Sequence, residues 1–497
     1  MATPLAAAPS FLDRPAVVGG AHDWTWRQVH AAAVTLSQEL RRQLGRELRA
    51  TATICNLCSS RIGFLVASLA AWRSRCEQLL PPSAGNAELL ATLRSSVEPI
   101  VLFDDAEELQ RHGPAGMRSL LHVPELPTQP LADADLAWSP EWERPLVRLF
   151  TSGSTGTPEP HAKTLAQLAR GASALATRLE HDVDGGLAAL RQIVCSVPPQ
   201  HMFGLETSVM LPLMFGMPVL ERRPLLPADV STAFQRCSAA AWIATPVHLR
   251  ALVESAESLR SCRVVIASTM PLAPTLASQA ERLVAAPILE IYGSTETGAL
   301  AMRRTAQTTD WRPLPGVRFE AAAHGTVVWG AHFTSPQTLA DQTESDGLGG
   351  VRLLGRHADL IKIAGRRASL ANLNLLLQDL PGLADGVFYL PPDAAASAAT
   401  SAATSAAASA ATSAATSVAT SVAPTERLVL IYAGARLDRA AAIAWLRQRI
   451  DPVFLPRALI HVERLPRSES GKLPRAALDA VYSAWRDART RGRKSGP

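Results

Sequence analysis

The chain has 497 residues, too many for one hydrophobic core, because cores stop growing at about 250 to 300 residues. We therefore expect roughly two to four domains. Hydrophobic residues make up 47% of the chain and charged residues 19%, which is typical of a globular protein rather than a disordered one. The net charge of +5 is modest, and the basic segment after Trp485 has no interleaved aromatic residues, which excludes nucleic-acid binding from our expectations. We interpret that segment as a solvated end, with a docking surface for an acidic partner or for phosphates as the alternative.

Neither a membrane span nor a disulfide framework is expected. The longest apolar stretch, residues 204–220, is interrupted by Glu206 and Pro212 and falls short of the ~20 residues that cross a bilayer. The N-terminus lacks the basic region and apolar core of a signal peptide, so we expect a cytoplasmic protein. Six cysteines do not form a disulfide framework, and Cys55 and Cys58 have no second ligand pair for zinc, so they are predicted to be ordinary thiols.

The first elements in chain order predict a parallel α/β sheet. Residues 25–44 have a helical pattern, residues 51–57 a strand pattern and residues 61–76 a second helical pattern. Such alternation with short connections is typical of parallel sheets. Short apolar runs rich in β-branched residues recur between residues 140 and 300, where a second α/β unit is expected.

After Gly298 the pattern changes to short strands and turns, which indicates a small β-rich subdomain. The predicted fold class is therefore α/β, with a large N-terminal domain, residues 1–355, that contains two α/β subdomains and the β-rich one. A small mobile α+β domain, residues 360–497, is expected to follow a hinge at residues 356–359. We return to the basis of the hinge below.

Residues 394–423 are almost pure Ala, Ser and Thr, in consecutive tetrads that each begin with Ser. Such a segment has no apolar face to bury, and an Ala-rich helix without charge pairs would be marginal. We predict a surface loop inserted in the C-terminal domain. The fold can tolerate it, since each doubling of loop length costs only about 0.6 kcal/mol.

The strongest local motif follows an apolar strand at residues 146–150, where six small residues stand in a row. They are Thr151, Ser152, Gly153, Ser154, Thr155 and Gly156. Free backbone N–H groups, hydroxyls and glycines are what a loop around a triphosphate needs. A plain Ser/Gly turn would have a similar composition, and no Walker motif can be read through the segment.

A second motif closes another apolar strand about 140 residues later. It places an aromatic ring, hydroxyls and a carboxylate together, suited to a base, a phosphate and Mg²⁺ respectively. Its residues are Tyr292, Gly293, Ser294, Thr295 and Glu296. Either motif alone could be a turn, but two such motifs that each end a strand indicate a nucleotide site.

With these motifs the chain resembles the adenylate-forming superfamily of acyl-CoA synthetases, aryl-acid ligases and adenylation domains. TSGSTG is similar to its phosphate loop and YGSTETG to its adenine, phosphate and Mg²⁺ motif. The segment 339–367 resembles the part with the ribose-binding Asp and the hinge, and LPRSESGKLPR resembles the catalytic-lysine motif. The resemblance implies ATP and Mg²⁺ as cofactors, with Glu296 as the metal ligand and Thr295 beside it among the catalytic residues.

The resemblance also implies roles outside the two strand motifs. Asp341 takes the ribose role because it stands 15 positions before Arg356, the spacing in the family, and Arg356 would contact ribose or phosphate. Asp346 is the rival for the ribose role, although an Asp-Gly pair is typical of a turn. Lys472 would place its ammonium between the substrate carboxylate and the α-phosphate.

Two departures from the family pattern stand out. The phosphate loop usually continues Pro-Lys-Gly, but here Glu159 follows Pro158 and Lys163 comes four residues later. Lys163 either replaces the usual lysine, binding ATP, or that lysine is dispensable. In the hinge motif Ala358 holds the first Asp position and Asp359 the second, so we expect the pivot at or near Asp359.

The resemblance narrows the substrate. His201 lies where relatives have a His or an aromatic residue beside the reacting carboxylate, with a buried core histidine as the alternative. Amino-acid adenylation domains place an Asp here, and none occurs before Glu206, which disfavours amino acids. The chain is most similar to stand-alone ligases of aryl-polyene and xanthomonadin-type pathways, which implies an aryl or short acyl acid.

The expected reaction is activation of a small carboxylic acid to acyl-AMP with release of pyrophosphate, then transfer to a thiol. No carrier motif occurs in the chain, so the thiol of coenzyme A or of the phosphopantetheine of an acyl carrier protein must be supplied in trans. The alternatives are a fatty acyl ligase and a catalytically silent nucleotide or acyl sensor with the same fold.

Overall fold

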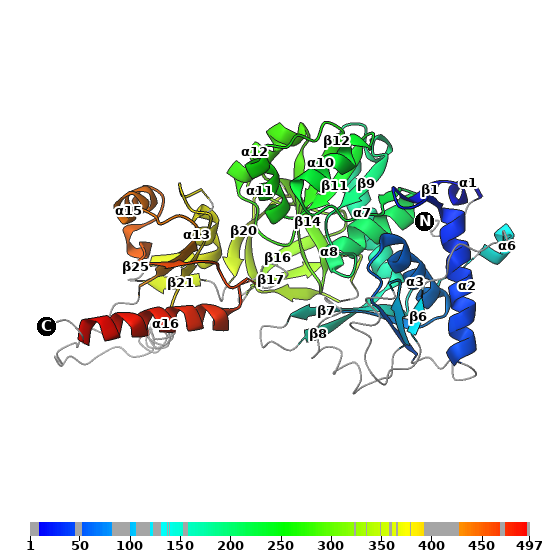
Figure 1. The fold of residues 1–497 in the computed structure, drawn as a ribbon, viewed down its shortest axis with the longest axis horizontal. Coiled ribbons are helices and arrows are strands. Elements are labelled where there is room, and N and C mark those ends of the chain that lie inside the picture. Colours follow the sequence, from blue (N-terminus) through cyan, green and yellow to red (C-terminus); the bar gives the residue numbers. More distant parts are fainter. Residues whose placement is uncertain are drawn as a thin grey trace. The chain divides into compact units, whose positions relative to one another are not determined.

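A computed structural model describes most of the chain (Figure 1). The described residues are 9–44, 52–81, 100–105, 120–122, 131–136, 138, 140–152, 158–322, 325–333, 335–347, 349–356, 360–363, 366–377, 379–391, 427–467 and 473–494. The chain divides into two compact units. The first comprises Met1–Glu320, Val327–Thr338 and Ser345–Arg352, and the second Ala321–Thr326, Leu339–Glu344 and Leu353–Pro497.

A nine-stranded sheet in the order β15-β14-β13-β12-β11-β9-β10-β1-β2 forms one part of the first unit. Its strands are β1 (Pro15–Val18), β2 (Trp24–Thr25), β9 (Gln192–Cys195), β10 (Val219–Leu220), β11 (Ala240–Ala244), β12 (Cys262–Ala267), β13 (Ile288–Ser294), β14 (Gly298–Arg304) and β15 (Arg312–Pro313). In the sheet order, the neighbouring strands β13, β12, β11, β9, β10 and β1 all run parallel. Strands β13 and β14 pair antiparallel, and so do β1 and β2. Strand β11 is buried along its whole length, as continuous apolar strands of parallel sheets are.

A six-stranded sheet in the order β6-β5-β3-β4-β7-β8 forms the other part. Its strands are β3 (Thr53–Asn56), β4 (Glu77–Leu80), β5 (Ile100–Phe103), β6 (Leu120–His122), β7 (Pro145–Ser152) and β8 (Pro158–Thr164). All neighbours are parallel except β7 and β8. Arg148 interrupts the apolar run of β7 because its guanidinium pairs with Glu77 on the adjacent strand, Nε to Oε1 at 2.9 Å.

The helices of the first unit cover these sheets and pack between them. They are α1 (Pro9–Leu12), α2 (Trp26–Leu44), α3 (Arg61–Arg73), α6 (Asp133–Leu136), α7 (Leu165–Asp182), α8 (Met202–Leu205), α9 (Leu211–Phe215), α10 (Pro227–Gln235), α11 (Pro246–Ser255) and α12 (Pro274–Val284), with η2 (Leu187–Ala189) and a π-helix, η3 (Glu206–Met210). Helix α7 begins in a capping box made by Thr164 and Gln167, directly after β8, and contacts β7, β8 and β14. It therefore links the ends of both sheets.

Small sheets follow, as the change of pattern after Gly298 predicts. One contains β16 (Arg318–Ala322), β17 (Gly325–Trp329) and β18 (Gln337–Leu339), and two-stranded sheets pair β19 (Asp341–Ser345) with β20 (Val351–Arg356) and β21 (Leu360–Ile363) with β22 (Arg366–Ser369). The predicted hinge stays a prediction, since Arg356 ends β20 and residues 357–359 lie outside the described residues.

The second unit contains a three-stranded sheet between two layers of helices. Its elements are β23 (Asp385–Tyr389), β24 (Val429–Ala433), β25 (Ala458–Val462), α13 (Leu370–Leu377), α15 (Arg439–Arg447), η6 (Pro452–Phe454) and α16 (Arg475–Lys494). One apolar cluster joins the sheet to α13 and α15, and a second joins its other face to α16 (Figure 1). This arrangement confirms the predicted α+β fold of the segment. The insertion at residues 394–423 lies outside the described residues.

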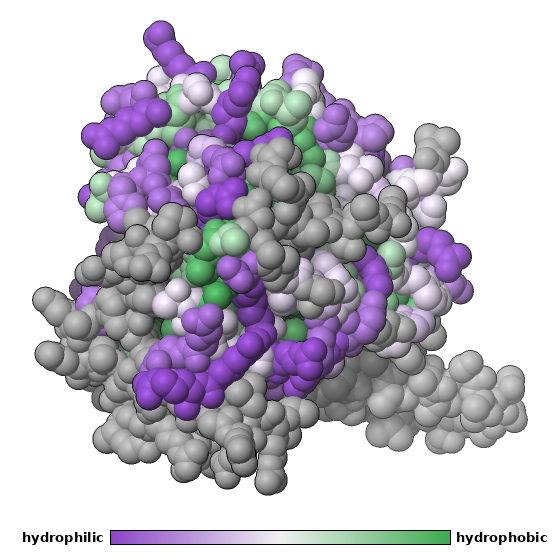
Figure 2. Space-filling view, turned by 90° about the vertical axis from the view of Figure 1, so that its right-hand side faces the viewer, coloured by the Kyte–Doolittle hydropathy of each residue, from purple (hydrophilic) through white to green (hydrophobic). Residues whose placement is uncertain are grey.

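The remaining physical predictions concern the membrane and the cysteines. No helix in the described part of the chain is long and apolar enough to cross a membrane. In the face drawn in Figure 2, hydrophobic residues show only in separate areas between hydrophilic ones. All six cysteines are buried and none of them forms a disulfide, as expected for a chain without a disulfide framework. The described residues contain no cluster of His, Cys, Asp or Glu arranged to hold a metal by themselves.

Candidate active site

The two sequence motifs lie at the turns of two antiparallel hairpins. Hairpin β7–β8 pairs Thr151 with Glu159, and hairpin β13–β14 pairs Ser294 with Gly298. Thr151 and Ser152 end β7, so the predicted phosphate loop begins where the strand ends. The rest of that loop, Gly153, Ser154, Thr155 and Gly156, lies outside the described residues.

The second turn presents Thr295 and Glu296 from a closed ring of hydrogen bonds. The Ser294 amide donates to the Thr297 hydroxyl at 3.2 Å, and the Thr297 amide donates to the Ser294 hydroxyl at 3.3 Å. Gly293 is required beside this turn, because a Cβ there would lie 2.2 Å from the Gly298 carbonyl oxygen. The backbone of the turn is therefore held by its own side chains.

Tyr292, on β13 shortly before the turn, is part of an aromatic cluster. Its ring centroid lies 5.6 Å from that of Trp311 and 6.4 Å from that of Phe319. The Arg303 guanidinium lies 4.2 Å from the centre of the Trp311 ring, on the cluster's other side. The cluster is suited to a flat base, as the sequence predicts for Tyr292.

Glu296 is an ionised and accessible carboxylate. Burial alone would raise its pKa, but hydrogen bonds from the Ser294 hydroxyl and from its own amide, with the charges of His161 and Lys163, hold the pKa of Glu296 below its usual value. The side chain keeps 45% of its surface exposed, and His161 Nε2 lies 3.8 Å from its Oε1. Such an oxygen donor suits Mg²⁺, which prefers carboxylates and water.

Lys163 connects the two hairpins from inside the protein. Its side chain is only 4% exposed, and its ammonium donates a hydrogen bond to the backbone carbonyl of Glu296. Burial lowers the pKa of Lys163, while the charges of Glu206 and Glu296 counteract part of that shift. The structure thus places this predicted ATP contact beneath the Glu296 turn, and a direct contact to ATP stays a prediction.

Glu206 is the buried charge that accompanies Lys163, and the sequence did not mark it as functional. Its carboxylate accepts from the Ala299 amide, with Oε2 at 3.2 Å. Burial raises the pKa of Glu206 to about 7, and Lys163 and the Ala299 amide counteract part of the shift. The sequence did contain a signal for Glu206, which is a single Glu within an apolar stretch. A buried carboxylate needs a partner, so such a residue points to a buried polar contact.

The other predicted residues lie on other elements. His201 is half-buried at the N-cap of α8 and its carbonyl accepts from the Leu205 amide at 2.8 Å. Asp341 begins β19 and Arg356 ends β20, both in the second unit. Asp346 is a turn residue, as the Asp-Gly pair predicts, since its Oδ1 accepts from the Gly350 amide at 2.7 Å.

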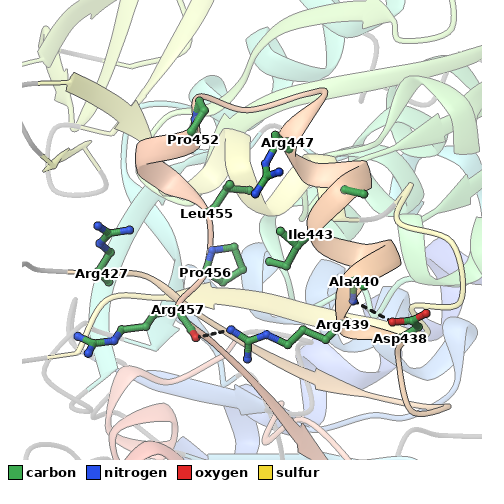
Figure 3. Close-up of a pocket in the computed structure, with 11 residues that line it drawn as sticks. Arg427, Asp438, Arg439, Ala440, Ile443, Arg447, Pro452, Leu455, Pro456 and Arg457 are labelled. Carbon is green, nitrogen blue, oxygen red and sulfur yellow. Dashed lines mark hydrogen bonds between the residues drawn. The ribbon is translucent and has the colours of Figure 1, made fainter.

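Lys472 lies outside the described residues. One cavity in the described residues contains none of the predicted site residues. It is a groove of about 970 Å³ in the second unit, on α15 and the segment that follows (Figure 3). Arg427, Arg439, Arg447 and Arg457 line it around Ile443 and Leu455. Arg439 Nη2 donates to the Arg457 carbonyl at 3.0 Å, which gives at least one of these arginines a structural role.

Comparison with known proteins identifies the family. The sequence profile of the AMP-binding enzyme family matches residues 6–326, and the chain belongs to this family. It is 30% identical over 222 residues to a 4-coumarate–CoA ligase of Halorhodospira halophila, covering 44% of this chain and 53% of that protein. The chain thus spans about half the length of the curated relatives it matches.

Two solved structures share the fold. One is the o-succinylbenzoate CoA synthetase of Bacillus subtilis in complex with its acyl-adenylate intermediate, with a TM-score of 0.74, 17% identity and coverage of 96% of this chain and 98% of that one. The other is ATP-bound MatB from Rhodopseudomonas palustris, with a TM-score of 0.74, 17% identity and coverage of 97% and 99%. These matches confirm the predicted fold class over nearly the whole chain.

Proposed function

We propose that this chain is an ATP- and Mg²⁺-dependent acid–thiol ligase. It activates a carboxylic acid as acyl-AMP, releases pyrophosphate, and transfers the acyl group to a thiol. The observation that carries the proposal is the meeting of two motif hairpins, where Lys163 of β8 binds the carbonyl of Glu296 in a chain of the AMP-binding family. The names of the matched relatives, which are CoA ligases, support the same reaction.

Each motif residue has a role in holding ATP. The hydroxyls and amides of residues 151–156 bind the phosphates, Tyr292 stacks on the adenine, and Asp341 and Arg356 bind the ribose and its phosphate. Gly293, Ser294 and Thr295 bring backbone and hydroxyl groups to the phosphates. Glu296 holds Mg²⁺, which neutralises phosphate charge when bound.

Lys472 stabilises the negative charge that develops between the substrate carboxylate and the α-phosphate. It lies on the small C-terminal domain, which rotates about residues 356–359 between the two half-reactions. The transfer that follows takes place at the thiol of coenzyme A or of a carrier protein supplied in trans. The protein acts in the cytoplasm.

An aryl or short acyl acid is the proposed substrate, with His201 beside the reacting carboxylate. Glu206 is the only carboxylate in the segment after His201, and it is buried and bound to the Ala299 amide. It is therefore poorly placed to hold the ammonium of an amino acid, which supports the exclusion of amino-acid substrates. A fatty acid is the competing acyl class.

The deciding experiment is ATP–pyrophosphate exchange with a panel of aryl, short-chain, fatty and amino acids. Exchange that depends on one acid class and on Mg²⁺ is expected, whereas the complete lack of exchange with every acid would favour a silent sensor. Lys472→Ala then separates the half-reactions. It should reduce pyrophosphate release roughly 10²- to 10³-fold but leave thioester formation from synthetic acyl-AMP nearly unchanged.

A further inference from the structure

Two buried charges lie beneath the turn that presents Glu296, and the reaction above assigns them no role. Lys163 on β8 and Glu206 at the start of the π-helix are each only 4% exposed. Lys163 donates to the carbonyl of Glu296, and Glu206 accepts from the amide of Ala299. The two side chains therefore hold the turn at two points, on either side of Thr297.

The packing is built around the Glu206 carboxylate. A Cβ at Gly171 of α7 would lie 2.8 Å from Glu206 Oε1, and a Cβ at Gly298 of β14 would lie 2.5 Å from the same atom. Real Cβ atoms do not approach this closely, so glycine at both positions leaves the space that the carboxylate fills. A π-helix of five residues, Glu206–Met210, begins at this residue, and single π turns occur often at functional sites.

Burial of Lys163 or Glu206 alone would be costly. An isolated buried ammonium or carboxylate would lose its hydration without compensation, whereas an opposite charge offsets part of that cost. The Glu206 carboxyl, which accepts from the Ala299 amide, is a buried group of opposite charge that offsets part of this cost for Lys163.

We propose that Lys163 and Glu206 are positioning residues for the Mg²⁺-binding turn, in which Lys163 holds the main chain at the Glu296 carbonyl and Glu206 holds it at the Ala299 amide. This inference rests on the proposed role of Glu296. In this role Lys163 acts from the interior through the protein backbone.

The test separates positioning from charge compensation with three variants. Lys163→Met removes the hydrogen bond to Glu296 and leaves Glu206 unpaired. Glu206→Gln leaves Lys163 unpaired but keeps an oxygen for the Ala299 amide. The double variant removes both buried charges, so its melting temperature should return toward that of the wild type.

Two measurements report on the state of the Glu296 turn. The first is the Mg²⁺ concentration that gives half-maximal ATP–pyrophosphate exchange, which should rise about 10- to 100-fold in Lys163→Met and stay raised in the double variant. The second is hydrogen–deuterium exchange of the peptide 288–304 in the ligand-free protein, which should be faster in both. Glu206→Gln should change the melting temperature more than the Mg²⁺ requirement.

Arg304→Met is the matched control, because it breaks an ion pair of the same strand β14 away from the turn, Nε to Glu281 Oε1 at 2.9 Å. It should lower the melting temperature and leave the Mg²⁺ requirement unchanged. A double variant that regains the wild-type Mg²⁺ requirement and exchange rate along with its stability would overturn the proposal.

Glu296→Gln serves as the reference for the proposed function. If it leaves the Mg²⁺ requirement unchanged, the role of Glu296 itself fails. If it raises the requirement while the double variant does not, only the positioning role of Lys163 and Glu206 fails. The double variant also keeps the test decisive if Lys163→Met does not fold.

Discussion

Hairpins β7–β8 and β13–β14 occupy equivalent places in two different sheets. Each begins with the last strand of a parallel series, paired with β4 in one sheet and β12 in the other, and each turns back as an antiparallel strand. Their turns differ in chemistry, since the first has only small residues between its strands and the second has the Glu296 carboxylate. The fold thus supplies two similar frames, and we propose that the turn residues decide which part of the nucleotide each frame binds.

The largest expected effect tests this division of roles with one glutamate from each hairpin. Glu296→Gln removes the ionised oxygen proposed to hold Mg²⁺, and ATP–pyrophosphate exchange should fall roughly 10²- to 10³-fold. Glu159→Gln is the matched control, because Glu159 is exposed on β8 and its loss should change exchange by no more than about twofold. Equal losses in both variants would show that the hairpins share the metal role.

A second prediction extends the comparison to two buried histidines on helices of the first unit. Burial lowers the pKa of His30 in α2 to about 4, and its Nδ1 has no hydrogen-bond partner among the described residues. Because the folded pKa lies below the unfolded value, stability is complete above about pH 6.5 and is lost as the pH falls toward 4, by roughly 3 kcal/mol at pH 4. His30→Leu should remove this acid-dependent loss in denaturant unfolding measured from pH 7 to pH 4.

His248 in α11 provides the contrast. Its pKa is also lowered to about 4 by burial, but its Nδ1 accepts from the Thr245 amide at 3.1 Å and caps α11. His248→Ala should therefore lower stability at every pH, since it removes a cap as well as a titrating group. An unchanged acid loss in His30→Leu would mean that other groups control the acid response.

Much of both sheets could be predicted from the sequence, but the hairpins could not. The strands that lead into the motifs are apolar runs between turns, and these became β7 and β13. Strand β8 escaped prediction because Pro158 and Pro160 argue against a strand. Proline is nevertheless tolerated there, since β8 is the edge strand of its sheet and proline costs little at an edge.

The contacts beneath the second turn could not be predicted from the sequence, for a different reason. Lys163 and Glu206 lie 43 positions apart, and their places beneath one turn depend on how the π-helix packs against α7 and binds β14 through the Ala299 amide. Periodicity describes the local backbone and gives no information on which side chains meet between elements. A family pattern gave the turn residues, and only three-dimensional packing gave the residues that support them.

A third prediction tests that support through glycine. Gly298 has a φ of +74°, and a Cβ there would lie 2.5 Å from Glu206 Oε1. Gly347 has a φ of +75° with nothing within 4 Å, so Gly347→Ala measures the backbone cost alone, about 1 kcal/mol. Gly298→Ala should cost about 2 kcal/mol more in thermal unfolding, because the methyl group displaces a buried carboxylate. Equal costs would show that the carboxylate moves away freely.

A fourth prediction lies outside both hairpins. Asp341→Ala removes a carboxylate proposed to accept from the ribose, and ATP binding measured by calorimetry should weaken about tenfold. Asp346→Ala removes the bond to the Gly350 amide, so ATP affinity should remain that of the wild type and stability should fall slightly. The opposite ranking would transfer the ribose role to Asp346.

The smallest effect on activity and stability is expected from the largest change in sequence, a deletion of the Ala/Ser/Thr insertion. Deleting residues 394–423 removes a segment of Ala, Ser and Thr with no apolar face, so the deletion should take away no core contacts. The cores on both faces of the β23-β24-β25 sheet are complete in the described residues, which supports a melting temperature and exchange rate within error of the wild type. A shorter loop between β23 and β24 would even lower the entropy cost of closing it by a few tenths of a kcal/mol or more. A clear loss of thioester formation with intact adenylation would instead assign the insertion to the transfer step, and with it a function that its composition does not reveal.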